Sequence, residues 1–271
     1  MIWTCRPSAI HPCRKNARCL LVLLALAHAA AACADEGDQE EPSATPYRPT
    51  VSNPAALSAP GWIEVEFGGQ RLFADRSRLD SVPWLLKYAF DENYGLLLGG
   101  DAHANLKIAG APSISGFGDT FLEWKQRFPV SDKSAFGIEA GVVAATAQRD
   151  LGIGSTQYVV NGIFSAGIGE LQLDLNLGGL RGGNLPSGVS LWQTTWAATV
   201  SGSFAENWGA AFEFSGAHQR GIATASEALA AISYNFSRRL VLDCGAAYGL
   251  AHAAHDRSVF AGATVLIGKL R

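Results

Sequence analysis

Strict alternation of apolar and polar residues in the stretch LQLDLNL, residues 171–177, most constrains what this chain can fold into. Side chains on a β-strand point to opposite faces with a period of two, so this stretch has a leucine face and a face of Gln172, Asp174 and Asn176. A helix cannot separate the residues in that way. The leucine face therefore meets either a second sheet in a soluble sandwich or lipid in an outer-membrane barrel.

Similar alternation recurs in about twelve segments between residues 61 and 267, each about ten residues long, which is the length of a tilted transmembrane strand. In every segment the apolar face lacks charged residues, and the charges lie on the opposite face. A charge facing lipid costs roughly 2–4 kcal/mol near the membrane midplane, so lipid selects this arrangement. We therefore predict an all-β fold, an antiparallel transmembrane β-barrel of about twelve strands over residues 61–271. A secreted soluble barrel or sandwich is the alternative.

The connections between the segments alternate in length. Short polar turns are predicted at residues 91–93, 129–134, 167–170, 205–207 and 237–239, and mostly longer connections at residues 70–80, 103–117, 148–155, 181–190, 218–223 and 252–257. Bacterial outer-membrane barrels have short periplasmic turns and longer external loops. The sequence therefore predicts a protein of the outer membrane of a Gram-negative bacterium, with both termini on the periplasmic side.

The N-terminal region is typical of an exported protein. Basic residues precede an apolar run from Cys19 to Ala34, which ends in small residues before Asp35. This order predicts a cleaved signal peptide over residues 1–34, with lipidation of Cys33 as an alternative. Residues 35–60 are acidic and then rich in Pro, Ser and Ala, and we predict that they form a disordered periplasmic linker.

Net charge and cysteine content limit the partners. Removal of the leader, with its four basic residues Arg6, Arg14, Lys15 and Arg18, changes the net charge from −3 to −7. An acidic chain of this kind argues against a nucleic-acid partner. Only Cys244 remains after the leader, so no disulfide framework is expected. The expected partners are outer-membrane lipid, the barrel-assembly machinery and a small-molecule solute, and the oligomeric state is left open.

Several segments resemble a known family. They are GFGDTFLEWKQRFP (residues 116–129), FGIEAGVVAAT (136–146), LQLDLNLGG (171–179), SRRLVLDCGAAYGL (237–250) and VFAGATVLIG (259–268). In this order they resemble the outer-membrane transporters grouped with the meta-pathway of phenol degradation, the MetA-pathway type. The resemblance implies a twelve-stranded barrel and a role in the passage of aromatic or other hydrophobic compounds.

The charged residues on the polar faces are the candidate lining of the lumen. They are Glu64, Glu66, Lys87, Asp101, Glu123, Lys125, Arg127, Glu139, Asp174, Glu213, Glu227 and Asp243. Rings of charge can set what passes through a pore, but the same groups can also hydrate or cross-link a narrow lumen. Because Glu123, Lys125 and Arg127 alternate along one strand, we expect them to pair with acids on neighbouring strands.

Enzymatic and metal sites are disfavoured by the sequence. The histidines after the leader, His103, His218, His252 and His255, all lie near predicted external loops. Ser215 lies three residues before His218, a spacing that puts the two on opposite faces of a strand and prevents a nucleophile–base pair. His252 and His255 with Asp256 form too small a set for a metal site.

We therefore expect a barrel that is not an enzyme and uses no cofactor or metal. Its predicted function is that of a passive outer-membrane channel or transporter for small solutes, aromatic or hydrophobic ones among them. A closed barrel with a structural or surface-interaction role is the first alternative. A barrel hydrolase that modifies lipid is the second.

Overall fold

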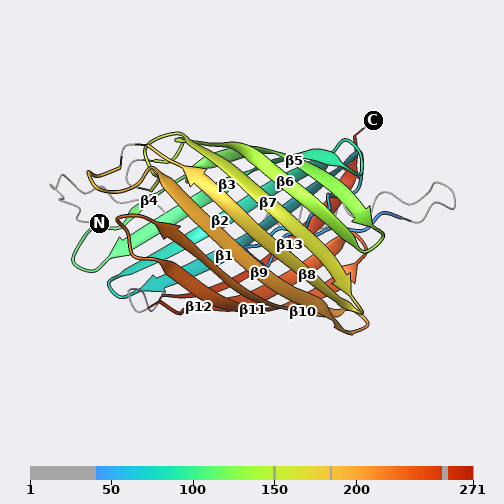
Figure 1. Cartoon of the computed structure of the whole chain (residues 1–271). Coiled ribbons are helices and arrows are strands. Elements are labelled where there is room, and N and C mark those ends of the chain that lie inside the picture. Colours follow the sequence, from blue (N-terminus) through green and yellow to red (C-terminus); the bar gives the residue numbers. More distant parts are fainter. Residues whose placement is uncertain (1–40, 149–150, 184, 252–255, 271) are drawn as a thin grey trace. The chain divides into compact units, whose positions relative to one another are not determined.

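The computed structural model describes residues 41–148, 151–183, 185–251 and 256–270, whose regular structure is entirely β (Figure 1). The strands are β1 (Trp62–Ala74), β2 (Ser77–Ala89), β3 (Tyr94–Ile108), β4 (Ile114–Gly116), β5 (Thr120–Ser131), β6 (Ser134–Ala144), β7 (Gln157–Ile168), β8 (Leu171–Arg181), β9 (Trp192–Ala205), β10 (Trp208–Gln219), β11 (Ala225–Ser237), β12 (Leu240–Gly249) and β13 (Arg257–Lys269). None of the described segments is a helix that is long and apolar enough to cross a membrane.

The strands form one antiparallel sheet that closes on itself. β1 pairs with both β2 and β13, so the first and last strands seal the barrel. The first half of β3 pairs with β5. The three-residue β4 pairs only with residues 104–106 in the second half of β3. The wall therefore has twelve strands, and β4 is an accessory to it. The predicted fold class and strand number are confirmed.

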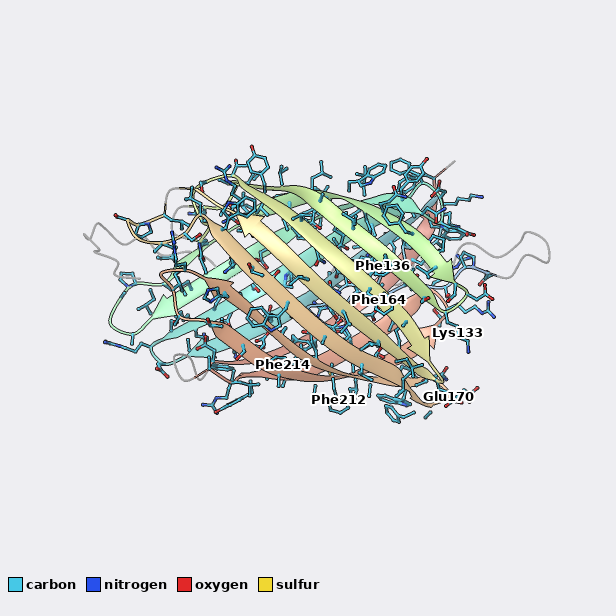
Figure 2. All side chains as sticks on the ribbon, in the orientation of Figure 1. Lys133, Phe136, Phe164, Glu170, Phe212 and Phe214 are labelled. Carbon is cyan, nitrogen blue, oxygen red and sulfur yellow. The ribbon has the colours of Figure 1, made fainter. Side chains whose placement is uncertain are left out.

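The apolar faces point outward, as the alternation predicts. On β8, Leu177 is 66% exposed, whereas Asp174 on the other face is only 6% exposed. Figure 2 shows phenylalanines on the outside of three strands, namely Phe136 on β6, Phe164 on β7, and Phe212 and Phe214 on β10. Because a soluble protein seldom exposes so continuous an apolar surface, this exterior is suited to lipid.

Aromatic side chains gather at the end of the barrel with the short turns. Tyr94 lies between Phe90 and Trp124, with ring centroids 5.5 and 5.2 Å apart. Across the sheet, the ring centroids of Trp208 and Tyr234 are 4.8 Å apart. Aromatic belts of this kind lie at the membrane–water interface of outer-membrane barrels.

Two connections that were predicted to be long loops are largely strand. Only residues 75 and 76 separate β1 from β2, although a loop was predicted over residues 70–80. β3 continues to Ile108, and β4 occupies part of the predicted loop over residues 103–117. The extensions carry charged residues on their outward positions, so they lack the apolar face by which the other strands were found. Apart from the two-residue β1–β2 turn, the longer connections lie at one end and the short turns at the other, and we assign the short-turn end to the periplasm.

Residues 41–60 differ from the expected disordered linker. They belong to the same compact unit as the barrel and lie in its lumen, hydrogen-bonded to the wall. The segment has too few apolar residues to fold alone, but the buried carboxylates of the wall supply the partners that its backbone requires. The remainder of the predicted linker, residues 35–40, and the predicted signal peptide lie outside the described residues.

Substitution Leu175→Arg on β8 is expected to destabilise the barrel by roughly 2–4 kcal/mol, because the charge would face lipid near the middle of the strand. Denaturant unfolding in lipid vesicles measures the change. Leu191→Arg is the matched control, since Leu191 is exposed in the connection after β8 and its replacement leaves the lipid-facing surface intact. Equal effects of the two substitutions would contradict the assignment of the leucine face to lipid.

Candidate functional site

The lumenal segment, residues 41–60, enters and leaves the barrel at the same end. Near its start, Glu41 pairs with Arg239 in the β11–β12 turn at 3.0 Å. At its other end, Pro60 forms a bridge with Ala89 at the end of β2, next to the β2–β3 turn. Both of these turns belong to the periplasmic end, so the segment is a loop inserted into the lumen from that side.

A buried lysine and two glutamates hold the first part of the loop. Lys87 on β2 forms ion pairs with Glu64 and Glu66 on β1, and all three side chains are buried. The glutamates also accept hydrogen bonds from the loop, from Thr45 N to Glu64 at 2.9 Å and from Tyr47 N to Glu66 at 2.7 Å. Because a buried charge is costly unless it is paired and hydrogen-bonded, the loop stabilises the charges of the wall.

Tyr47 lies between the two buried lysines of the wall. The Nζ atoms of Lys87 and Lys125 are 3.9 and 4.0 Å from the centroid of its ring, which places both cations in contact with the aromatic face. Burial and the negative charge of Glu139 raise the pKa of Tyr47 well above its usual value of 10.0. The hydroxyl therefore stays protonated and donates a hydrogen bond to Ala56 O at 2.8 Å, which ties the two arms of the loop together.

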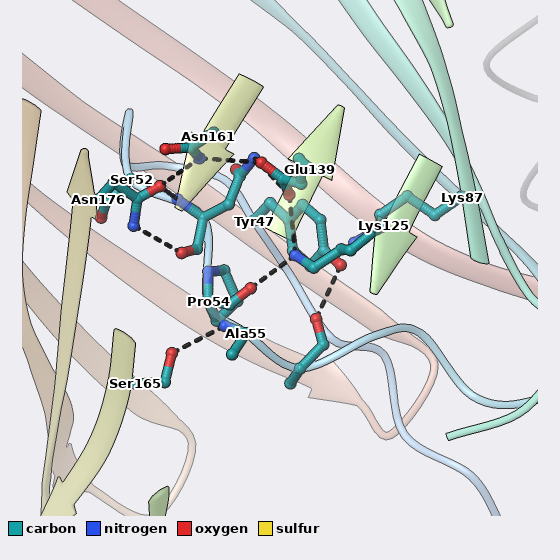
Figure 3. A network of polar contacts seen from close by, with 12 residues as sticks. Tyr47, Ser52, Pro54, Ala55, Lys87, Lys125, Glu139, Asn161, Ser165 and Asn176 are labelled. Atoms are coloured by element: carbon teal, nitrogen blue, oxygen red, sulfur yellow. Dashed lines mark hydrogen bonds and ion pairs between the residues drawn. The ribbon is translucent and has the colours of Figure 1, made fainter. Parts of the chain in front are cut away.

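Deeper in the lumen, Figure 3 shows a network of polar contacts that includes Lys125, Glu139 and Asn176. Asn53 of the loop binds both Glu139 and Asn176. Its side-chain nitrogen donates to both carboxylate oxygens of Glu139 at 3.0 Å. Its backbone exchanges hydrogen bonds with the side chain of Asn176. Lys125 pairs with Glu139 at 3.0 Å and donates to Pro54 O at 2.6 Å. The network therefore joins the tip of the loop to β5, β6 and β8.

Glu213 on β10 binds the other side of the tip. Its carboxylate accepts hydrogen bonds from Val51 N and Ser52 N, the latter at 2.8 Å. It also accepts one from the hydroxyl of Thr199 on β9, which is itself 2.5 Å from the hydroxyl of Ser52. Consecutive backbone N–H groups directed at one carboxylate are a common means of holding a buried anion.

Arg48 connects the loop to β12, which lies two strands from β1 in the sheet. Its Nε and Nη2 atoms donate to the two oxygens of Asp243 on β12 at 3.2 and 3.1 Å, which is a bidentate pair. Space for the guanidinium comes from glycines on β1 and β13. A Cβ atom added at Gly68 would lie 2.9 Å from Arg48 Cζ, and one added at Gly262 would lie 2.5 Å from Arg48 Nε.

The structure places all of the predicted lumen residues on inward positions. Eight of them are buried, namely Glu64, Glu66, Lys87, Lys125, Glu139, Asp174, Glu213 and Asp243. The other four, Asp101, Glu123, Arg127 and Glu227, are partly exposed to the lumen. Of the three charges that alternate on β5, only Lys125 has an ion pair among the residues described, and that partner is Glu139 on the neighbouring strand.

The partners that the loop supplies were not predicted from the sequence. Thr45, Tyr47, Arg48, Ser52 and Asn53 were all assigned to a linker. One signal was available, because the predicted lumen contains many more acidic than basic residues. Such an excess of carboxylates inside a narrow barrel requires additional hydrogen-bond donors, and the segment next to β1 was a possible source of them.

The loop divides the lumen into separate cavities. A cavity of about 490 Å³ lies toward the end with the longer connections and is lined by Val51, Asn53, Glu123 and Glu227 among others. Two cavities of about 410 and 400 Å³ lie toward the short-turn end, and Pro54 contributes to both. The stretch from Val51 to Pro54 therefore forms the barrier between the two sides.

Ser215 and His218, which the sequence raised as a possible nucleophile and base, are not brought together. Ser215 is buried inside the barrel, whereas His218 is exposed and contacts Thr224 through Nδ1 at 2.8 Å, so the two lie on opposite faces as predicted. No group of three or more His, Cys, Asp or Glu residues within the described ranges is arranged to hold a metal ion. His252 and His255, which were considered as metal ligands, lie outside those ranges.

The fold is that of an outer-membrane β-barrel with a loop in its lumen. Neither a protein-family model nor a curated protein matches the sequence. Among solved structures, the chain is similar to an outer membrane channel from Pseudomonas putida F1, with a TM-score of 0.62 and 12% identity over 85% of this chain and 99% of that one. It is also similar to the NanC porin, with a TM-score of 0.53 and 8% identity over 74% of this chain and 98% of that one. The KdgM porin has a TM-score of 0.51 and 9% identity over the same shares.

The pair formed by Arg48 and Asp243 is expected to couple the loop to the wall. In a double-mutant cycle with Arg48→Gln and Asp243→Asn, the loss of stability should be less than additive by about 1–3 kcal/mol, because each single change already removes the bidentate contact. Denaturant unfolding measures the coupling. Additive losses of stability would show that the two groups do not interact. The control combines Arg48→Gln with Asp132→Asn, because Asp132 is an exposed turn residue and should behave as an independent site.

Proposed function

We propose that this protein is a passive channel for small solutes in the outer membrane of a Gram-negative bacterium, closed at rest by the lumenal segment. The observation that carries the proposal is the cavity of about 490 Å³, which has Asn53 and Glu139 in its lining and is separated from the cavities at the periplasmic end by a layer that includes the loop tip. Withdrawal of residues 45–56 toward the periplasm would join these cavities into a path across the barrel.

Several features support a loop that moves rather than a fixed core. The loop is held mainly by hydrogen bonds and ion pairs, and Ala55 with Ala135 and Ile163 forms its only apolar cluster within the described residues. Polar contacts exchange with water at a small net cost, whereas withdrawal of a large apolar surface would be costly. A solute with donors of its own can replace the backbone N–H groups that the wall carboxylates bind.

The family and the solute class rest on the sequence resemblance. We propose that the chain belongs with the outer-membrane transporters grouped with the meta-pathway of phenol degradation and that aromatic or other hydrophobic compounds are among its solutes. We also propose export by a cleaved signal peptide over residues 1–34 and insertion by the barrel-assembly machinery. In this proposal the protein has no catalytic role and needs no cofactor.

A closed barrel with a structural or surface-interaction role is the second candidate, because the loop fills the middle of the lumen. The two functions differ in one measurable property, which is conductance after removal of the loop. A variant that lacks residues 45–56 should conduct strongly in planar bilayers, and the unaltered protein should conduct less and intermittently. Absence of current from a correctly folded deletion variant would favour the closed barrel.

A disulfide between the loop tip and the wall is expected to hold the channel shut. The hydroxyl oxygens of Ser52 and Thr199 are 2.5 Å apart, so Ser52→Cys with Thr199→Cys brings two thiols within bonding range. Cys244, which is exposed on the outer face, is replaced by Ala to prevent other pairings. The oxidised variant should show little current, and a reductant should restore it. Each single cysteine variant is the control, and equal current before and after reduction would contradict gating by the loop.

Once open, the channel should prefer cations. The candidate lumen residues that the loop leaves behind are nine acids, Glu64, Glu66, Asp101, Glu123, Glu139, Asp174, Glu213, Glu227 and Asp243, and three basic residues, Lys87, Lys125 and Arg127. A wall with an excess of negative charge attracts cations and excludes anions. The reversal potential of the loop-deletion variant in a salt gradient measures the preference, and Glu213→Gln with Asp243→Asn should reduce it. Anion preference would contradict the assignment of these groups to the conducting path.

A further inference from the structure

A basic patch lies on the outer face of the barrel, at the end with the longer connections. Its residues come from four adjacent strands, with Arg71 on β1, Arg78 on β2, Lys107 on β3 and Arg257 on β13. Phe73 is the direct partner of both Arg257 and Arg78, and Arg78 is the partner of Lys107, so these side chains form one row across the sheet. On β1, Arg71 and Phe73 are an odd number of residues away from Glu64 and Glu66, whose side chains face the lumen. Because side chains alternate between the two faces of a strand, the row faces outward.

The patch has more positive charge than its own acid can neutralise. Asp80 is its one carboxylate among the described residues, and it contacts Arg71 and Arg78, the latter at 3.2 Å. Four cations against one anion leave a net charge of +3. Arg78 Nε is buried and has no hydrogen-bond partner, and Lys107 and Arg257 form no ion pair within the described part of the chain. The exposed side chains of Lys107 and Arg257 therefore have donors available for an external anion.

Apolar side chains separate these cations. Phe73, Val82, Tyr248 and Val259 are exposed on the same face and continue the lipid-facing surface up to the basic row. An anion that binds here is therefore adjacent to hydrocarbon. Phosphate attached to acyl chains meets both conditions, because arginine binds phosphate through its planar fork of donors and the apolar residues accommodate the chains.

We propose that Arg71, Arg78, Lys107 and Arg257 bind the phosphate groups of a phosphorylated glycolipid headgroup in the outer leaflet of the membrane. The short-turn end of the barrel faces the periplasm, so the patch lies at the level of the outer-leaflet headgroups. This inference goes beyond the proposed channel function and does not depend on conduction.

Native mass spectrometry of the full chain, released from detergent in the presence of lipid A, tests the proposal. The unaltered protein should retain lipid A in preference to lipid A without its phosphates and to phosphatidylethanolamine. The triple variant R78Q, K107Q and R257Q should bind lipid A at least roughly tenfold more weakly, since each basic residue contributes to the attraction of an anionic headgroup. Arg71 is retained because it pairs with Asp80.

The matched control removes basic residues from the opposite end. Lys133 lies in the β5–β6 turn and Lys269 at the end of β13, and both are exposed at the periplasmic end. K133Q with K269Q should leave lipid A binding unchanged. Equal losses of lipid A binding in the two variants would mean that only the net charge of the protein matters, which would overturn the proposal. Undiminished binding by the triple variant would also overturn it. Heat-dependent gel mobility checks that each variant is folded. If the triple variant fails to fold, the double variant K107Q and R257Q, which changes two exposed side chains, should still weaken lipid A binding, and undiminished binding would overturn the proposal.

Discussion

The structure depends on the requirement that charges inside a narrow barrel be paired. Glu64 and Glu66 are buried beside Lys87, and one lysine cannot satisfy two carboxylates. The unmet acceptors receive backbone N–H groups from the loop of residues 41–60, so a segment with too few apolar residues to fold alone becomes ordered. Burial of polar groups, which usually opposes folding, here determines where the loop lies, because each group is matched by a partner of opposite character.

The wall of the barrel could be predicted from the sequence because lipid imposes one simple rule. Every outward position that crosses the hydrocarbon must be apolar, and the period of two makes that rule visible even in a short stretch such as LQLDLNL. The inward positions of Glu139, Asp174 and Glu213 follow from the same rule, since a strand has only two faces. Fold class, strand number and the direction of each candidate side chain were therefore accessible without coordinates.

The position of the loop and the strand extensions could not be predicted from the sequence, for two different physical reasons. The partners of Arg48 and Asn53 are Asp243 and Glu139, far along the chain, and composition carries no information about such distant hydrogen bonds. The extensions of β1, β2 and β3 rise to the headgroup level, where water and polar headgroups tolerate charge. Arg71 and Asp80 face each other there on the outward face, so the apolar alternation that identifies a strand is absent.

The path of the lumenal loop has a topological consequence. Glu41 and Pro60 are both held at the periplasmic mouth, by Arg239 and Ala89 respectively. The chain between them therefore enters and leaves the lumen by the same opening, as a loop with both ends outside the pore. Such a loop can leave and re-enter the lumen without passing a chain end through the pore, and the β1–β13 pairing stays closed. In the gating that we propose, the withdrawn loop remains attached at the mouth at a high effective concentration, which favours its reinsertion.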